Sequence, residues 1–78
     1  MNNNDKQKDL VALKRKIGLN IWQAIEQSNL PREYVAERLQ VTKRTVGYWQ
    51  SGEKLPSIER FVLLSQLLGV SLEGLLLV

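Results

Sequence analysis

The segment from Lys43 to Ser51 carries the side chains of this chain that are best suited to bind another polar molecule. At about 100° per residue, a helix over this segment places Thr45, Val46 and Trp49 together on one side. The other side carries two cations, a phenol, a hydroxyl and a residue without a side chain, namely Lys43, Arg44, Tyr48, Ser51 and Gly47. Lys and Arg donate hydrogen bonds to O6 and N7 of guanine in the major groove, and a glycine lets the helix backbone come close to the base edges. The pattern therefore favours groove recognition over a plain solvated surface helix.

The residue types of the chain do not favour a catalytic site. There is no His and no Cys, so the usual general base, the usual zinc ligands, thiolate nucleophiles and disulfides are excluded. Ser51 and Ser57 have no candidate base of a suitable type. Glu33 and Glu37 lie one helical turn apart, on a face where such pairs are usually solvated. We expect no enzyme activity, no cofactor and no metal ion.

A helix-turn-helix pattern over residues 32–51 positions the polar face. The first helix carries Val35, Ala36 and Leu39 as its apolar residues. The turn at Gln40 and Val41 is too short for antiparallel packing, so the two helices must cross steeply. Thr42 is the predicted N-cap of the second helix, and Gly52 is its predicted end.

The remaining apolar periodicity predicts an all-α chain of five helices. A first helix is expected from about Leu10 to Ser28, followed by Asn29 as a helix stop. Ser57 and Ser71 are predicted N-caps of two further helices, and Gly69 ends the first of these. Residues 10–78 then form one helix-turn-helix domain. Residues 1–9 are rich in Asn and Lys and are expected to be a flexible arm, either a solubilising tail or a DNA-contacting arm.

Charge and hydropathy limit the class of protein and its location. The chain has 78 residues and a net charge of +3, and residues 1–16 hold five cations and two carboxylates, which is also +3. The remaining residues therefore balance to zero. The polar N-terminus does not resemble a signal peptide, and no apolar run has membrane-spanning length. We expect a soluble, cytoplasmic protein with no membrane partner.

Some apolar residues fit no predicted core position. Leu19 and Trp22 lie opposite the stripe of Ile17, Ile21 and Ala24. Either residues 10–16 fold back over them or they meet a second subunit. The C-terminal run exceeds what one face of a short helix can bury. The predicted dimer or partner surface is therefore Trp22, Leu75, Leu76, Leu77 and Val78.

From Ile17 to Leu76 the chain resembles the Cro/CI-type helix-turn-helix family, the XRE-like regulators of bacteria and phages. The resemblance is ungapped across the five predicted helices. Its matching residues are Ile17-Gly18, Ile21, Leu30, Val35-Ala36-Glu37, Leu39, Val41, Thr45-Val46, Trp49, Gly52, Pro56-Ser57-Ile58 and Leu68-Gly69-Val70-Ser71-Leu72-Glu73. It implies a compact bundle of the lambda-repressor-like type that binds operator DNA, usually as a dimer. It also implies a bacterial or phage-encoded protein located at the nucleoid.

Site roles follow from the resemblance, position by position. The positions that read base edges in the family are Lys43, Arg44, Gly47 and Tyr48 here. Contacts to the DNA backbone are expected from Arg32, Thr42, Ser51 and Lys54.

Three departures from the family pattern are informative. Arg32 replaces a Gln that often clamps a phosphate, and Gln40 replaces the usual turn Gly. Because a non-Gly residue at positive φ is strained by about 1 kcal/mol, the turn is expected to be slightly altered. Ile25 and Gln50 occupy positions where many members have an Arg–Glu pair, so no orphan charge remains.

The leading hypothesis is a sequence-specific DNA-binding transcriptional regulator, a repressor that reads a near-palindromic operator as a homodimer. The alternative is a protein-interaction module of the antitoxin or anti-repressor type, which binds a partner protein through its exposed apolar residues.

Overall fold

Five helices make up the part of the chain that the structure describes. This computed structural model describes the backbone of residues 3–77 and the side chains of residues 7–77. The helices are α1 (Asn3–Ser28), α2 (Arg32–Leu39), α3 (Lys43–Ser51), α4 (Ile58–Leu68) and α5 (Leu72–Leu76), and no strand occurs in the described residues. The prediction of an all-α, five-helix bundle is confirmed.

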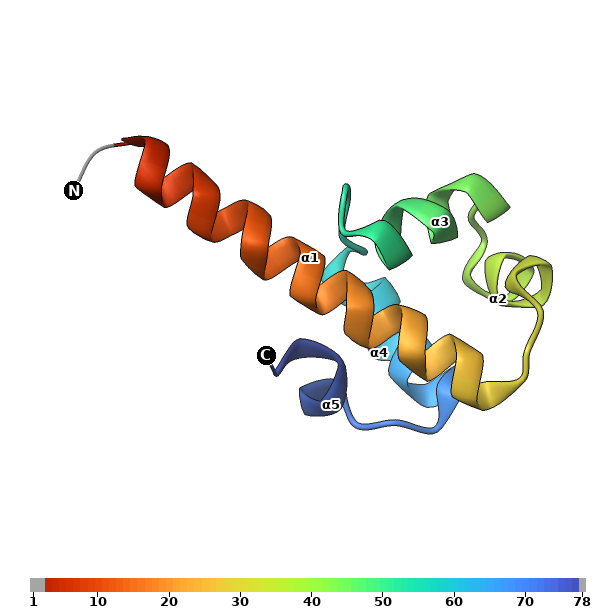
Figure 1. Cartoon of the computed structure of the whole chain (residues 1–78). Coiled ribbons are helices and arrows are strands. Elements are labelled where there is room, and N and C mark those ends of the chain that lie inside the picture. The colour runs from red at the N-terminus through yellow and green to blue at the C-terminus, as the bar shows by residue number, and fades with distance from the viewer. Residues whose placement is uncertain (1–2, 78) are drawn as a thin grey trace.

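Helix α1 is the longest of the five helices described and is longer than predicted. It runs for 26 residues, and its N-terminal half projects beyond the other helices (Figure 1), so the molecule measures 42 × 23 × 20 Å. The predicted start at Leu10 was wrong, because residues 3–9, expected to be a flexible arm, form the first turns of α1. No Gly or Pro precedes Gly18, and each residue added to an existing helix gains a hydrogen bond without a new nucleation cost.

One apolar core joins all five helices. Helix α1 contributes a stripe at helical spacing, against which α3, α4 and α5 pack, and α2 joins the core through α3 and α4. The buried members are Ile17, Ile21, Ala24, Ile25, Val35, Ala36, Leu39, Val46, Trp49, Phe61, Leu64 and Leu75.

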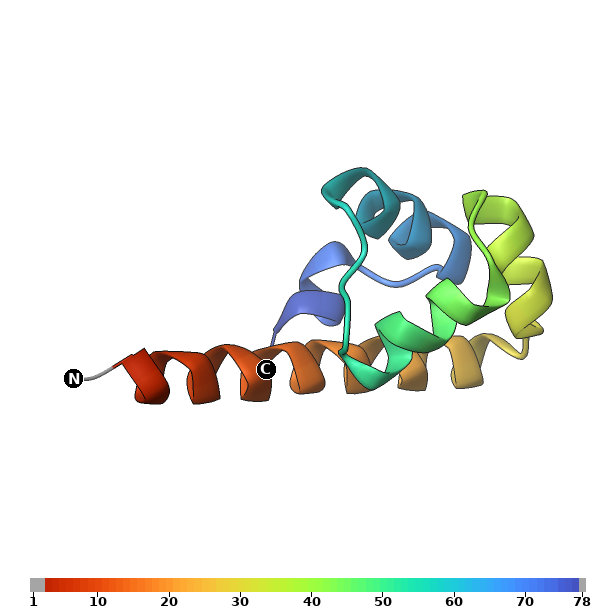
Figure 2. The same cartoon turned by 90° about the horizontal axis from the view of Figure 1, so that it is seen from above.

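Two glycines set the distance between α1 and the C-terminal end of α3. A Cβ atom on Gly18 would lie 2.6 Å from the backbone nitrogen of Gly52 and 2.8 Å from the carbonyl oxygen of Trp49. Gly52 also has a φ of 78°, which favours glycine. The backbones therefore meet directly at this crossing, and α3 lies beside α1 (Figure 2).

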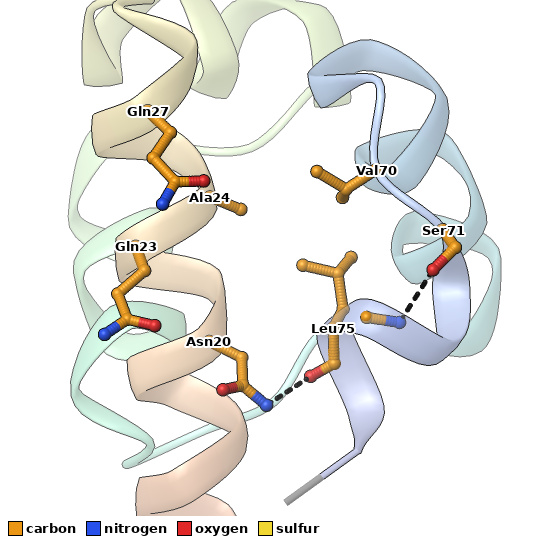
Figure 3. A pocket seen from close by; sticks show the side chains of 8 residues that line it. Asn20, Gln23, Ala24, Gln27, Val70, Ser71 and Leu75 are labelled. Atoms are coloured by element: carbon orange, nitrogen blue, oxygen red, sulfur yellow. Dashed lines mark hydrogen bonds between the residues drawn. The ribbon is translucent and has the colours of Figure 1, made fainter.

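The C-terminal helix is bound to the middle of α1 by Asn20. The side-chain nitrogen of Asn20 donates to the carbonyl oxygens of Leu75, at 3.1 Å, and Leu77, at 2.7 Å; Figure 3 shows the first of these bonds. Ser71 caps α5 by accepting a hydrogen bond from the backbone nitrogen of Gly74. The two bonds from Asn20 hold α5 against α1, and the Ser71 bond stabilises the start of α5.

The predicted role of Leu75 in a subunit contact was wrong. Only 1% of Leu75 is exposed, because α5 folds back onto α1 and inserts this side chain into the chain's own core. Leu76 is partly buried, whereas Leu77 is 69% exposed. Val78 lies outside the described residues, so its predicted role stays a prediction. The apolar C-terminal run therefore divides between core and surface.

Leu19 and Trp22 remain on the surface of α1. The helix is continuous through residues 10–16, so that segment does not fold back over them as one alternative proposed. The exposed fractions are 43% for Leu19 and 44% for Trp22. The described part of the chain thus leaves both side chains open to a partner.

Candidate nucleic-acid interface

The turn between α2 and α3 is tight because Gln40 adopts the left-handed conformation. Its φ and ψ are 58° and 44°, and its backbone nitrogen donates to the carbonyl oxygens of Ala36 and Glu37. The backbone nitrogen of Val41 then donates to the carbonyl oxygen of Ala36, at 3.0 Å. These bonds satisfy the last carbonyl groups of α2. Gln40 thus adopts the positive φ that favours glycine, although it replaces the usual turn Gly.

Thr42 begins α3 as predicted. Its side-chain oxygen accepts a hydrogen bond from the backbone nitrogen of Thr45, at 3.1 Å. This bond satisfies one of the backbone donors that every helix start leaves unpaired. The two hydroxyl oxygens of Thr42 and Thr45 also lie 3.0 Å apart. The exposed Thr42 therefore combines a cap with a position at the positive end of the helix dipole, which attracts anions.

Helix α3 separates an anchoring side from a polar side. Val46 and Trp49 are 0% and 3% exposed and fix the helix in the core. On the polar side the flanking members Lys43, Arg44 and Ser51 are exposed, whereas Gly47 and Tyr48 are partly buried. The helix thus presents to the outside the same residues that its sequence pattern predicted.

The Tyr48 ring organises two cations on this side. The Nε atom of Arg44 donates to the Tyr48 hydroxyl, at 2.7 Å, and its guanidinium carbon lies 5.5 Å from the ring centroid. The Lys54 Nζ atom lies 5.0 Å from the same centroid. Both distances fall within the range of cation–π attraction. Tyr48 therefore holds Arg44 and Lys54 together at the C-terminal part of α3, a cluster that no sequence spacing had predicted for Lys54.

The Ser51 hydroxyl makes two hydrogen bonds within the chain. Its hydroxyl donates to the carbonyl oxygen of Tyr48, at 3.1 Å, and accepts from the backbone nitrogen of Glu53, at 3.3 Å. The single hydroxyl hydrogen is therefore engaged. A phosphate contact from Ser51 requires this hydrogen bond to break.

Arg32 and Gly47 lie next to each other, although they belong to different helices. A Cβ atom on Gly47 would lie 3.9 Å from the Nη1 atom of Arg32. Arg32 is exposed at the first residue of α2. The missing side chain at position 47 therefore leaves space beside the Arg32 guanidinium, and the cation lies at the edge of the polar side of α3.

Glu33 is a residue of this surface that sequence reasoning treated only as solvated. Its carboxylate forms an ion pair with Lys43, and the Nζ and Oε1 atoms lie 2.5 Å apart. The hydrogen bond from Lys43 holds the pKa of Glu33 below its ordinary value of 4.5, so the carboxylate stays charged at neutral pH. Both side chains are largely exposed, which makes the pair weak. The only sequence signal was the opposite charge of two residues in the first turns of neighbouring helices, α2 and α3.

Gln50 has one buried polar atom without a partner among the described residues. Ile25 is buried in the core, in agreement with the absence of an orphan charge. The Oε1 atom of Gln50, however, is buried and accepts no hydrogen bond from the described residues. A neutral amide oxygen is less costly to bury than a charge.

Comparison with known proteins identifies the family of this fold. A helix-turn-helix family model matches residues 23–75, which extend from the second half of α1 into α5 and include the α2–α3 pair. Comparisons with the curated proteins and with the solved structures found no match. Within the described residues, no helix combines the length and apolar content that a bilayer crossing needs. The matched segment contains every residue of the polar surface described above, and the chain is a DNA-binding helix-turn-helix regulator that belongs to the Cro/CI-type, XRE-like family.

Proposed function

We propose that this protein is a transcriptional repressor that reads a near-palindromic operator as a homodimer. Helix α3 enters the major groove, and α2 crosses the DNA backbone. The observation that carries this proposal is the polar side of α3, on which Arg44 is held by Tyr48 while Val46 and Trp49 anchor the helix in the core. A side chain positioned before binding loses less conformational freedom when it meets a base.

The base contacts come from the residues at the centre of this side. Lys43 and Arg44 donate to guanine acceptors, Gly47 lets the backbone come close, and Tyr48 contacts bases beside Arg44. Each good contact of this kind is worth roughly 1–3 kcal/mol of discrimination. Arg32, Thr42, Ser51 and Lys54 bind phosphates and fix the register of the protein on the duplex.

Lys43 is available to DNA only after its ion pair with Glu33 opens. The pair is exposed, so its cost is small. Phosphate oxygens repel the Glu33 carboxylate, and the approach of DNA therefore separates the two side chains. Glu33 thus lowers the affinity for any DNA, whereas the base contacts determine which DNA sequence is preferred.

Selection of bound duplexes from a random pool, repeated at two salt concentrations, tests the function. The expected result is a near-palindrome with half-sites about 10 base pairs apart and an affinity that falls steeply with salt. Weak binding without a common sequence contradicts the proposal. It favours the alternative function, binding of a partner protein, which the exposed Leu19 and Trp22 support.

Arg44→Ala, compared with Arg38→Ala, tests the role of α3. Both arginines are exposed, and each donates to a tyrosine one turn away on its own helix, Tyr48 and Tyr34 respectively. Arg38 lies beside Leu63 and Gln66 of α4, away from the polar side of α3. Arg44→Ala is expected to lower operator affinity about 5- to 150-fold, the equivalent of roughly 1–3 kcal/mol, and Arg38→Ala to leave it nearly unchanged. Equal losses in the two variants contradict base reading by α3.

A further inference from the structure

The N-terminal half of α1 projects beyond the bundle and carries the net charge of the chain. Every described side chain from Gln7 to Lys16 is exposed, and burial in the core begins at Ile17. This segment contains four cations and one carboxylate, whereas cations and carboxylates are equal in number from Ile17 onward. The excess of +3 is therefore concentrated on an open helical surface.

The C-terminal end of α3 lies against α1 at the inner end of this projecting half. A Cβ atom on Gly52, the residue after α3, would lie 2.7 Å from the Cα atom of Arg15 and would also contact the carbonyl oxygen of Lys14. Figure 2 shows the end of α3 against α1, with the N-terminal half of α1 continuing past it. In Figure 1 this half rises toward the side of the molecule on which α3 lies. The projecting surface therefore continues from the end of α3.

Helical geometry places Lys14 and Arg15 on the side of α1 that carries Gly18, and Lys8 at the edge of that side. Lys14 and Arg15 precede Gly18 by four and three residues, spacings that put side chains on one face of a helix. Lys8 precedes Arg15 by seven residues, almost two full turns, and lies in line with it. Because Gly18 faces the end of α3, the three cations lie on the α3 side of the projecting half.

Acidic side chains do not cancel this positive surface. Asp9 and Lys16 are nine and two residues from Gly18, so a turn of about 100° per residue places both on the opposite side of the helix. Glu53 lies beside Arg15 in the hollow between α1 and the loop after α3, but it forms no ion pair with any cation whose side chain the structure describes. The cations near α3 are therefore available to a polyanion.

We propose that Lys14, Arg15 and Lys8 bind phosphates of the DNA beside the half-site that α3 reads. The phosphate contacts proposed for Ser51 and Lys54 lie at the C-terminal end of α3, and Ser51 lines the same hollow as Lys14 and Arg15. The positive side of α1 prolongs this row of contacts along the duplex. Lys8 and Arg15 are about 10 Å apart along the helix axis, which corresponds to about three base pairs.

Charge and continuity identify DNA as the partner of this surface. The duplex carries one negative charge about every 1.7 Å along its axis, which complements an open surface with an excess of cations. The chain belongs to a DNA-binding family, and the polar side of α3 ends at this surface. The α1 contact rests on the proposed function, because α3 has to bring DNA beside it. It reads no sequence, however, since phosphates carry no sequence information.

A matched pair of lysine variants tests this surface. Lys14 and Lys16 are both exposed and two residues apart, but they lie on opposite sides of α1. Lys14→Gln is expected to reduce the slope of log affinity against log salt by about 0.9, which is the loss of one phosphate contact. Between about 50 and 200 mM salt this amounts to a roughly 3.5-fold smaller loss of affinity. Lys16→Gln should leave the slope nearly unchanged, and equal changes in the two variants overturn the α1 contact.

Titrations with a duplex of arbitrary sequence separate the α1 contact from operator reading. Because phosphate contacts do not depend on sequence, the difference between Lys14→Gln and Lys16→Gln should appear on any duplex. Circular dichroism of both variants checks that the bundle stays folded. A protein that selects an operator but shows no such difference refutes the α1 contact alone. A protein that shows the difference but selects no operator refutes operator reading alone.

Ethylation of single phosphates in the selected operator locates the contact. Ethylation removes the charge of a phosphate, so it weakens binding wherever the protein contacts that phosphate. The triple variant Lys8→Gln/Lys14→Gln/Arg15→Gln is expected to lose sensitivity at up to three phosphates within about three base pairs of the half-site. Sensitivity at the phosphates next to α3 should remain. The same set of sensitive phosphates in the parent and the triple variant overturns the assignment of these cations to DNA.

Discussion

Gly47→Ala should stabilise the fold and weaken DNA binding, two effects of opposite sign from one methyl group. Position 47 lies inside α3, where glycine is a poor helix former. The nearest atom to a Cβ at this position is Nη1 of Arg32, at 3.9 Å, which is ordinary van der Waals contact. The free protein therefore accommodates the methyl group, whereas the groove surface proposed for α3 has to receive it.

The size of each effect follows from these contacts. Ala exceeds Gly in a helix interior by about 0.8–1 kcal/mol, and 1 kcal/mol raises the unfolding midpoint of a domain this small by roughly 4–8 °C. In the complex the methyl group presses against base edges that the glycine backbone approaches. Overpacking of this kind costs about 1–3 kcal/mol, which corresponds to an affinity loss of roughly 5- to 150-fold.

Thermal unfolding and titration of the selected operator measure the two effects on the same protein. Gly18→Ala is the control, since Gly18 is also inside a helix but its Cβ would lie 2.6 Å from the backbone nitrogen of Gly52. This variant should lose stability despite the same gain in helix propensity. An unchanged operator affinity in Gly47→Ala refutes the close approach of α3 to the bases. A lowered unfolding midpoint refutes the inference that position 47 has room for a methyl group in the free protein.

Two further predictions concern the turn and the acidic residue beside α3. Gln40→Gly should raise the urea midpoint by the equivalent of at most about 1 kcal/mol, because glycine adopts the observed φ of 58° without strain; a lower midpoint with an unchanged slope contradicts this. Glu33→Gln should strengthen binding to any DNA and steepen the salt dependence by up to about one unit, since it removes the carboxylate that neutralises Lys43 and repels the phosphates. Because Lys43 lowers the pKa of Glu33, the ion pair is present above the ordinary carboxyl value of 4.5 and is lost as the pH falls through the lower folded value. The increase in DNA affinity caused by Glu33→Gln should therefore be constant from about pH 6 to 8. An increase that varies with pH in this range has another cause.

Local chemistry made much of the fold predictable. Thr42, Ser57 and Ser71 accept hydrogen bonds at the starts of three helices, as their residue types indicated. Asn29, Gly52 and Gly69 adopt positive φ where helices end. These features depend on residues within one turn of each other, so the order of residues along the chain is enough to predict them.

Tertiary packing decided what the sequence left open. No local signal distinguished Leu75, which inserts into the core, from the exposed Leu77 two residues later. The same holds for the α2 residues Glu33 and Arg32, which lie beside Lys43 and Gly47 of α3 only because the two helices cross.

The sequence by itself determined the five helices and the residues on the polar side of α3, because these depend on periodicity and short-range hydrogen bonds. It indicated the family through its resemblance to known members. The three-dimensional structure decided which of those residues are held by neighbours, and that α1 carries its cations past the C-terminal end of α3. Contacts between segments far apart in the chain depend on how whole helices pack, and packing is a property of the assembled core.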